Sequence, residues 1–435
     1  MSGLGERFVG GAYSALMRIL TPAILLRYWM RGRSEPTYRH AVAERLGRHA
    51  GPAQPGALWV HAVSLGETRA AAALIDALRR HRPGMRLLLT HGTATGREAG
   101  AALLREGDVQ AWLPLDTPGA VRRFLGHFQP TVGVLMETEV WPNLIRAARL
   151  NGIALVLANA RLSERSLQKG ERFAALLKPA LRGLDLVLAQ TEDDARRFKA
   201  GGATRVVIAG NLKFDMTPNA EQLARGRAWR DAVGRKVVLA ASTREGEEAP
   251  LLDAWAALAA PRPLLLIVPR HPQRFDEVAQ LVVASGLTFE HRSRWAKVPP
   301  AEAHGVDVWL GDSIGEMATY YATAHVALLG GSFAPLGGQN LIEAAACGCP
   351  VVMGLHTFNF ADAAERALSA GAAIRVQDIR CGVNRAVALA TAEELSDWSA
   401  RAQRFAAAHR GAARHMSAAI TQLANLRERA STDAP

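Results

Sequence analysis

Acidic side chains follow two apolar segments in the first half of the chain. Glu67 comes a few residues after one such segment, and Glu137 and Glu139 follow another directly. A carboxylate at the start of a helix is favoured by the helix dipole by ~0.3–1 kcal/mol and needs no catalytic role. The same group in a crevice is a candidate general base, and an E-x-E pair could hold a metal or share acid–base work. Taken alone, the stretch around Glu67 favours the helix cap.

Basic and amide side chains follow other apolar segments. Arg161 comes after the run 153–159, Lys213 lies in "GNLKFD", and Arg270 follows the run 263–269. A lysine at the end of a strand suits a phosphate or a carboxylate, although a surface ion pair explains it equally well. Each cluster is weak alone. Their repeated position after apolar segments, in both halves of the chain, is more informative.

A glycine-rich segment in the second half, "GGSFAPLGGQNLIEAAACGCPVVMG", offers a site for a nucleotide. Its four glycines at 330, 331, 337 and 338 permit close backbone approach or positive φ. A helix is expected to begin near Asn340, with backbone N–H groups suited to a phosphate and Glu343 suited to ribose hydroxyls. The sequence has no GxxxxGK[ST], no GxGxxG after the first strand and no D-x-D. These absences disfavour a P-loop, a simple dinucleotide site and a metal-bound nucleotide diphosphate.

Eleven near-continuous Val/Leu/Ile runs must position these residues. Such runs, separated by amphipathic segments, predict strands buried on both faces of parallel sheets with crossover helices. One TIM-like barrel with extra strands would fit this number, but two open sheets facing across a cleft fit better. Ligands of open parallel sheets bind beyond the carboxyl ends of the strands. The predicted fold is therefore α/β, in two halves that each contain an open parallel sheet.

The expected division of the chain follows from the polar stretch after "GNLKFD". We expect an N-terminal membrane anchor or interfacial helix, a first α/β domain, a linker with a short helix, a second α/β domain, and a C-terminal helix and tail. These segments cover residues 1–33, 34–215, 216–234, 235–400 and 401–435.

The N-terminal stretch 7–33 is apolar but interrupted by Arg18 and Arg27. No charge-free run reaches the ~18–20 residues of a clear membrane span. Further arginines and the aromatics Tyr28 and Trp29 lie at its end, as at a membrane interface. We expect an interfacial helix with everything after it on the cytoplasmic side. The alternative is an ordinary helix docked on the first domain.

The composition of the chain limits the classes of molecule that it is expected to bind. The chain has 435 residues, a formal net charge of +12 and three cysteines without framework spacing. The charge favours an anionic partner such as a phospholipid surface, a phosphorylated substrate or nucleic acid. The sequence contains no helix-turn-helix, RRM or zinc pattern, so no nucleic-acid partner is expected. A non-catalytic membrane scaffold is disfavoured by the ordered carboxylates after the strands.

Several long segments resemble the 3-deoxy-D-manno-octulosonic acid (Kdo) transferases of lipopolysaccharide synthesis. They are, in order, "HAVSLGE", "METEVWPNLI", "ANARLSERS", "GNLKFD", "STREGEE", "VPRHPQRF", "GDSIGEM" and "GGSFAPLGGQNLIEAAACGCPVVMGLHTFNF". The resemblance implies a GT-B fold with the active site between two Rossmann-like domains and no cofactor or metal. It also implies CMP-Kdo as donor and a lipid A precursor as acceptor, at the cytoplasmic face of the inner membrane of a Gram-negative cell. Another GT-B nucleotide-sugar transferase or an epimerase remains the alternative.

The resemblance also implies roles for individual residues. Glu67 matches the general base, and Glu137 and Lys213 match groups that stabilise the transition state. The segments that match the CMP-binding motifs contain Pro269, Arg270, Gly315, Glu316, Met317, Asn340, Leu341, Ile342 and Glu343. Residues that could contact the acceptor or support the site are Ser64, Gly66, Glu139 and Arg161. Partial burial in the cleft and the nearby Glu137 are expected to raise the pKa of Glu67, against the stabilising helix dipole.

Overall fold

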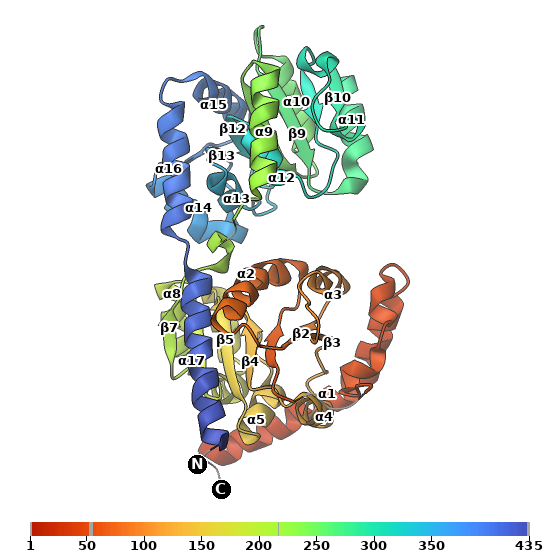
Figure 1. The fold of residues 1–435 in the computed structure, drawn as a ribbon, viewed down its shortest axis with the longest axis vertical. Helices are drawn as coiled ribbons and strands as arrows, with labels where there is room; N and C mark the ends of the chain where they lie inside the picture. The colour runs from red at the N-terminus through yellow and green to blue at the C-terminus, as the bar shows by residue number, and fades with distance from the viewer. Residues whose placement is uncertain (1, 52–54, 216, 433–435) are drawn as a thin grey trace. The chain divides into compact units, whose positions relative to one another are not determined.

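The structure, a computed structural model, describes residues 2–51, 55–215 and 217–432. It divides into two compact units (Figure 1). Unit 1 comprises residues 1–215 and 410–435, and unit 2 comprises residues 216–409.

Unit 1 is built on a seven-stranded parallel sheet with the order β3-β2-β1-β4-β5-β6-β7. Its strands are β1 Leu58–His61, β2 Leu87–His91, β3 Val109–Trp112, β4 Val132–Met136, β5 Ala154–Ala160, β6 Leu186–Ala189 and β7 Val206–Ile208. Both faces are covered, because Leu58 and Val60 of β1 enter one core cluster and Trp59 enters the other. The continuous apolar runs of the sequence reflect this double burial.

Nine α-helices of the described residues belong to unit 1. They are α1 Ser2–Arg31, α2 Leu65–His81, α3 Ala94–Ala101, α4 Pro118–Phe128, α5 Pro142–Leu150, α6 Glu164–Glu171, α7 Ala174–Arg182, α8 Glu192–Ala200 and α17 Ala412–Thr432. Three 3₁₀ turns join them: η1 Pro36–Arg39, η2 Val42–Leu46 and η3 Leu212–Asp215.

The C-terminal helix α17 returns to unit 1. Figure 1 shows it beside α2, and its Met416 and Ile420 are fully buried in the same core cluster as β1 and α2. Asp215, the last residue of the first segment of unit 1, accepts hydrogen bonds from the backbone N–H groups of Gly411 and Ala413. One carboxylate therefore ties the point where the chain leaves unit 1 to the point where it re-enters.

Unit 2 has a second seven-stranded parallel sheet with the order β10-β11-β9-β8-β12-β13-β14. Its strands are β8 Val237–Thr243, β9 Leu264–Pro269, β10 Phe289–His291, β11 Val308–Leu310, β12 Val326–Leu329, β13 Val351–Met353 and β14 Ala373–Arg375. Its α-helices are α9 Ala220–Val233, α10 Glu248–Ala256, α11 Phe275–Ala284, α12 Met317–Thr323, α13 Leu341–Ala346, α14 Ala361–Ser369, α15 Ile379–Thr391 and α16 Leu395–Ala408. Both units therefore have the doubly wound α/β architecture expected from the sequence.

Two segments differ from the expected division of the chain. The segment 216–234 was expected to be a linker with a short helix. Its helix, the 14-residue α9, instead belongs to unit 2 and packs on α12 with Trp229 fully buried. The expected C-terminal helix after residue 400 is two helices, since α16 belongs to unit 2 and α17 to unit 1. Only one face of α9 is buried, and the segment contains many polar residues. This polar composition led to the prediction of a connecting segment.

Helix α1 is docked on unit 1. Tyr13 Oη donates to Asp116 Oδ2 over 2.9 Å, and Ser14 Oγ donates to Asn143 Oδ1 over 2.8 Å. The same chain segment, Gly5–Arg31, is long and apolar enough to cross a membrane by length and composition. Its outer side chains include Phe8 and Ile19, which are 78% and 75% exposed. The helix thus has one docked face and one unpartnered apolar face.

Candidate active site

Three neighbouring strands of unit 1 bring the predicted acidic residues together. Strands β1, β4 and β5 are adjacent in the sheet, and their carboxyl ends lead to Glu67, to Glu137 and Glu139, and to Arg161. The carboxyl ends of parallel strands share one edge of the sheet, where ligands of this architecture bind. Of the predicted residues, Glu137 and Glu139 come close enough to Glu67 to act on it electrostatically.

Glu67 lies in the first turn of α2 and is held from two sides. The backbone N–H of Val63 donates to Glu67 Oε2 over 2.8 Å, and Ser64 Oγ donates to Oε1 over 3.0 Å. Ser64 is the N-cap of the helix and accepts from the N–H of Glu67. This reciprocal pattern resembles a capping box. Gly66, in the same turn, is exposed.

The environment of Glu67 raises its pKa above the ordinary value. Burial is the largest cause, and the nearby carboxylates of Glu137 and Glu139 add to it. The hydrogen bonds from Val63 and Ser64 oppose the shift without cancelling it. The expected direction, with burial and Glu137 as causes, is confirmed. A carboxylate with a raised pKa is a stronger base than an exposed one at the same pH.

Glu137 has a strained backbone. Its φ of 57° lies in the left-handed region, which non-glycine residues rarely adopt. Its N–H donates to the carbonyl of Ala158 over 2.9 Å and its carbonyl accepts from the N–H of Arg161 over 3.4 Å, so strand β5 holds this conformation. Such strain concentrates at functional sites, where the surrounding structure maintains it.

Glu139 is oriented by aromatic neighbours. Trp141 Nε1 donates to Glu139 Oε2 over 2.7 Å, and His61 Nε2 lies 3.8 Å from the same oxygen. His61 is fully buried on β1, and its Nδ1 lies 3.0 Å from Thr90 Oγ1. His61 was not predicted as a site residue, although it begins the motif that contains Glu67.

Asn159 positions the segment that carries Lys213. It is fully buried, has a positive φ of 52°, and its Oδ1 accepts from the N–H of Leu212 over 3.0 Å. A second link runs through Gln190, whose Nε2 donates to the carbonyl of Asn159 and whose Oε1 accepts from Nδ2 of Asn211. Lys213 itself is half-buried in η3. Asn159 lies within β5, and nothing in the sequence pattern indicated this role.

Three strands near the centre of the sheet of unit 2 lead to the predicted donor residues. The sheet order there is β11-β9-β8-β12, and the segments after β11, β9 and β12 contain Gly315, Arg270 and Asn340. Arg270 is exposed, while Pro269 is buried at the end of β9.

The segment around Asn340 begins α13. Asn340 is the N-cap, with Oδ1 accepting from the N–H of Ile342 and Nδ2 donating to Glu343 Oε1 over 3.1 Å each. The side chains of Leu341 and Ile342 are core residues, 1% exposed each, so only their backbone could meet a ligand. The motif thus combines a short helix cap with hydrophobic packing.

The carboxylate of Glu316 is already engaged within unit 2. Arg225 and Arg292 each place a guanidinium nitrogen 2.9 Å from Glu316 Oε1. Burial opposes ionisation of Glu316, but the hydrogen bonds from Ser313 and Arg292 and the charge of Arg225 outweigh it and lower its pKa. The neighbouring Gly315, with a φ of 84°, is exposed, and Met317 is half-buried at the start of α12.

Glu247 was missed by the sequence analysis. It is 3% exposed and accepts three backbone hydrogen bonds, from Arg244 and Gly331 at Oε2 and from Phe333 at Oε1. One buried carboxylate therefore joins the turn after β8 to the glycine-rich turn after β12. The motif "STREGEE" contained this residue, but nothing in its spacing indicated which acid turns inward.

The glycine-rich turn depends on close packing. A Cβ on Gly330 would lie 2.2 Å from the carbonyl oxygen of Ser242, which itself has a positive φ of 56°. Gly337 has a φ of 91°, and a Cβ there would meet Asn359. The expected glycine roles of close approach and positive φ are both present. Within residues 2–51, 55–215 and 217–432, no three His, Cys, Asp or Glu side chains group as metal ligands.

Two doubly wound parallel sheets, with polar clusters after the carboxyl ends of their strands, define a GT-B glycosyltransferase fold. The UDP-GlcNAc 2-epimerase of Neisseria meningitidis shares the fold, with a TM-score of 0.54 at 16% identity over 85% of this chain and 99% of that chain.

Sequence comparison identifies the family. The model for 3-deoxy-D-manno-octulosonic-acid transferase (kdotransferase) matches residues 40–216. The 3-deoxy-D-manno-octulosonic acid transferase of Bordetella pertussis is 49% identical over 93% of this chain and 97% of its own length. That of Haemophilus influenzae is 35% identical, covering 86% and 89%. The chain belongs to the 3-deoxy-D-manno-octulosonic acid transferase family.

Proposed function

We propose that this chain transfers Kdo from CMP-Kdo to a lipid A precursor, lipid IVA, with Glu67 as the general base and with inversion at the anomeric carbon. Membership of the family supports the transferred sugar. The observation that carries the mechanism is the held, half-buried Glu67 with its raised pKa, beside two other carboxylates.

The proposed step is a single displacement. A hydroxyl oxygen of the acceptor bonds to the anomeric carbon of Kdo while the bond from that carbon to the phosphate oxygen of CMP breaks. The hydroxyl proton passes to a Glu67 oxygen, and the bonding electrons leave with CMP. A carboxylate has about four lone-pair sites, so the two hydrogen bonds that orient Glu67 leave room to accept this proton. One base on the face opposite the leaving group gives inversion.

The leaving group, CMP, needs little catalytic assistance to depart. A nucleoside monophosphate departs with little protonation, so this mechanism requires neither a general acid nor a metal ion. Arg270, Asn340 and Glu343 are the proposed donor contacts. Glu247 fixes the glycine-rich turn that precedes Asn340. Lys213 and Glu137 are proposed to stabilise charge in the transition state.

The proposed location is the cytoplasmic face of the inner membrane. A lipid acceptor must be reached at a bilayer surface, and α1 presents exposed apolar side chains with arginines at its end. Because α1 is docked through Tyr13 and Ser14, we propose that it lies on the phospholipid surface rather than acting as a separate anchor.

A direct assay tests the function. The purified chain, CMP-Kdo and a tetra-acylated lipid A precursor should release CMP and yield a product heavier by Kdo. Glu67→Gln should still be stabilised by CMP yet lose about 10²–10⁴-fold in transfer rate. Normal turnover by this variant would overturn the base assignment. Stronger thermal stabilisation by UDP than by CMP would instead favour another GT-B transferase or an epimerase.

A further inference from the structure

A cavity of about 330 Å³ lies in unit 1 beside the loop that carries Glu137 and Glu139. Small-molecule sites occupy roughly 300–1,000 Å³, so this cavity is large enough for a ligand. Thr138 and Val140 of the loop form part of its wall, and α6, α7 and α8 supply the rest. The lining is mainly apolar and includes Val140, Leu162, Leu167, Leu177, Leu181 and Phe198.

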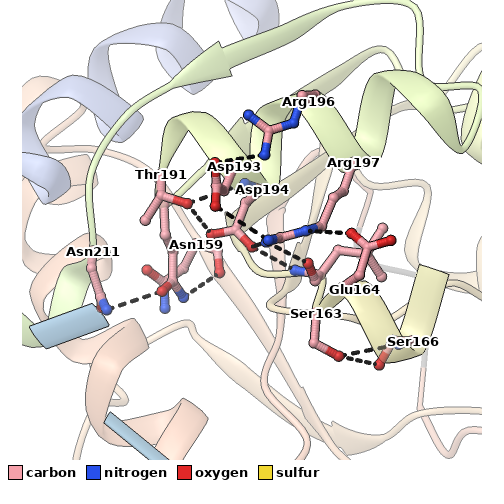
Figure 2. Close-up of polar contacts among 12 residues, drawn as sticks. Asn159, Ser163, Glu164, Ser166, Thr191, Asp193, Asp194, Arg196, Arg197 and Asn211 are labelled. Carbon is pink, nitrogen blue, oxygen red and sulfur yellow. Dashed lines mark hydrogen bonds and ion pairs between the residues drawn. The ribbon is translucent and has the colours of Figure 1, made fainter. Parts of the chain in front are cut away.

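A buried polar network supports one wall of the cavity. Asp194, 5% exposed, accepts from the N–H of Leu162 over 2.9 Å, and Arg197 Nη1 donates to the carbonyl of Leu162 over 3.2 Å. Arg197 also pairs with Glu164, which ties α8 to α6 (Figure 2). Helix α6 itself buries no residue, so its Leu167 lines the cavity without entering the core. These polar bonds fix the position of Leu162 in the cavity wall.

The chain segment that borders the cavity is basic. Residues 161–182 contain six arginines or lysines and two acids. The charged lining residues are Lys178 and Glu171, and Arg165, Lys169 and Arg172 are exposed on or just after α6. Phe173, 64% exposed, precedes α7, which packs against α1. An apolar interior beside a mainly cationic segment complements a phosphorylated lipid.

We propose that this cavity holds one acyl chain of the acceptor. The inference rests on the proposed function, because it assigns the lipid part of that acceptor to a site. Burying methylene groups against the apolar part of the lining stabilises binding. The polar members of the lining are Thr138, Ser166, Glu171 and Lys178. The cavity shares the 137–140 loop with the carboxylates, so a seated chain holds the attached sugar beside them.

Cavity-filling variants test the assignment. Ala174 and Ala200 line the cavity without being buried, so Ala174→Phe and Ala200→Phe place a ring in it with little strain on the core. Ala175→Phe is the matched control, since Ala175 is exposed on the same helix and does not line the cavity. All three should keep the wild-type Tm and CMP affinity.

Kinetics with an acylated and a deacylated acceptor distinguish a loss of acyl-chain binding from a loss of the transfer reaction. With the tetra-acylated precursor, the filled variants should lose about tenfold in kcat/KM through KM, equivalent to leaving about two methylene groups in water. With the fully deacylated disaccharide bisphosphate, they should match the wild type. Equal losses with both acceptors, or no loss with either, would overturn the proposal.

A binding measurement distinguishes failure of this inference from failure of the proposed function. Dansyl-undecanoic acid should bind the wild type and Ala175→Phe, and bind the filled variants about tenfold more weakly. If no transfer occurs with any acceptor, this measurement still decides whether the cavity takes an acyl chain. Unchanged probe binding in Ala174→Phe and Ala200→Phe would reject it.

Discussion

Ser64 and Glu67 bond each other in both directions. The N–H of Glu67 donates to Ser64 Oγ over 3.4 Å, and that hydroxyl donates to Glu67 Oε1 over 3.0 Å. The same carboxylate therefore completes a helix cap and occupies the position proposed for the base. A cap fixes its direction, while burial and its acidic neighbours raise its affinity for a proton.

Ser64→Ala should reveal this double role. Loss of the cap should cost about 0.5–2 kcal/mol of stability. The Ser64 hydrogen bond lowers the pKa of Glu67, so its removal should raise that pKa further. Glu67 can act as a base only when it is ionised. The low-pH side of the kcat/KM profile, called the acid limb, should therefore move to higher pH. Asp378→Ala removes the cap of α15 in unit 2 and should leave the limb unmoved.

Glu137→Gln and Glu139→Gln should move the acid limb in the opposite direction. Each removes a negative charge that raises the pKa of Glu67, so ionisation of Glu67 would extend to lower pH. Glu137 is the larger cause, and its variant should give the larger shift. A pH profile of kcat/KM measures this order independently of any loss in plateau rate. A limb that stays in place in both variants would contradict the assignment of the limb to Glu67.

Glu247→Gln should loosen the glycine-rich turn of unit 2. Glutamine has one acceptor oxygen for three backbone N–H groups, so at least one buried donor loses its partner. This should cost about 1–3 kcal/mol, seen as a fall in Tm of several degrees. If the binding free energy of CMP falls by a similar amount, its Kd measured by calorimetry should rise about tenfold.

The control for Glu247 lies in the same unit. Glu277 pairs with Arg274 but its side chain is 56% exposed, so Glu277→Gln should leave CMP affinity unchanged. Equal CMP affinity in the Glu247 and Glu277 variants would show that the turn does not depend on the buried carboxylate.

Helix α1 should bring the protein to anionic vesicles. Phe8 and Ile19 are highly exposed, so Phe8→Asp with Ile19→Asp should leave Tm unchanged. Co-sedimentation with phosphatidylglycerol-containing vesicles should fall at least about tenfold, since apolar burial is lost and two anions are added. Val283→Asp, at a 64% exposed position in unit 2, is the control. Unchanged co-sedimentation in the α1 variant would exclude this face as the contact.

Most of both sheets could be predicted from the sequence, and the exceptions share a cause. The eleven apolar runs of the sequence are 57–63, 86–90, 132–136, 153–159, 184–190, 205–210, 236–242, 263–269, 307–311, 326–331 and 350–354. The three strands outside these runs are β3, β10 and β14, all at sheet edges. Edge strands are short and less buried, as in β10, where no residue is fully buried. Their sequences therefore lack the continuous apolar pattern of a strand covered on both faces.

The candidate site was predictable where strand ends could be recognised. Glu67, Glu137 and Glu139 follow central strands, and the parallel sheet brings them together. Glu247 and Asn159 could not be assigned roles, because each bonds a backbone segment that is distant in sequence. Such partners become visible only once neighbouring strands are paired.

The return of α17 has a consequence for the order in which the chain can fold during synthesis. Met416 and Ile420 complete the core beneath α2, the helix whose first turn carries Glu67. A ribosome makes all of unit 2 before it makes these residues. The unit that begins first therefore finishes last, and the carboxylate proposed as base reaches its final setting only after nearly the whole polypeptide has emerged.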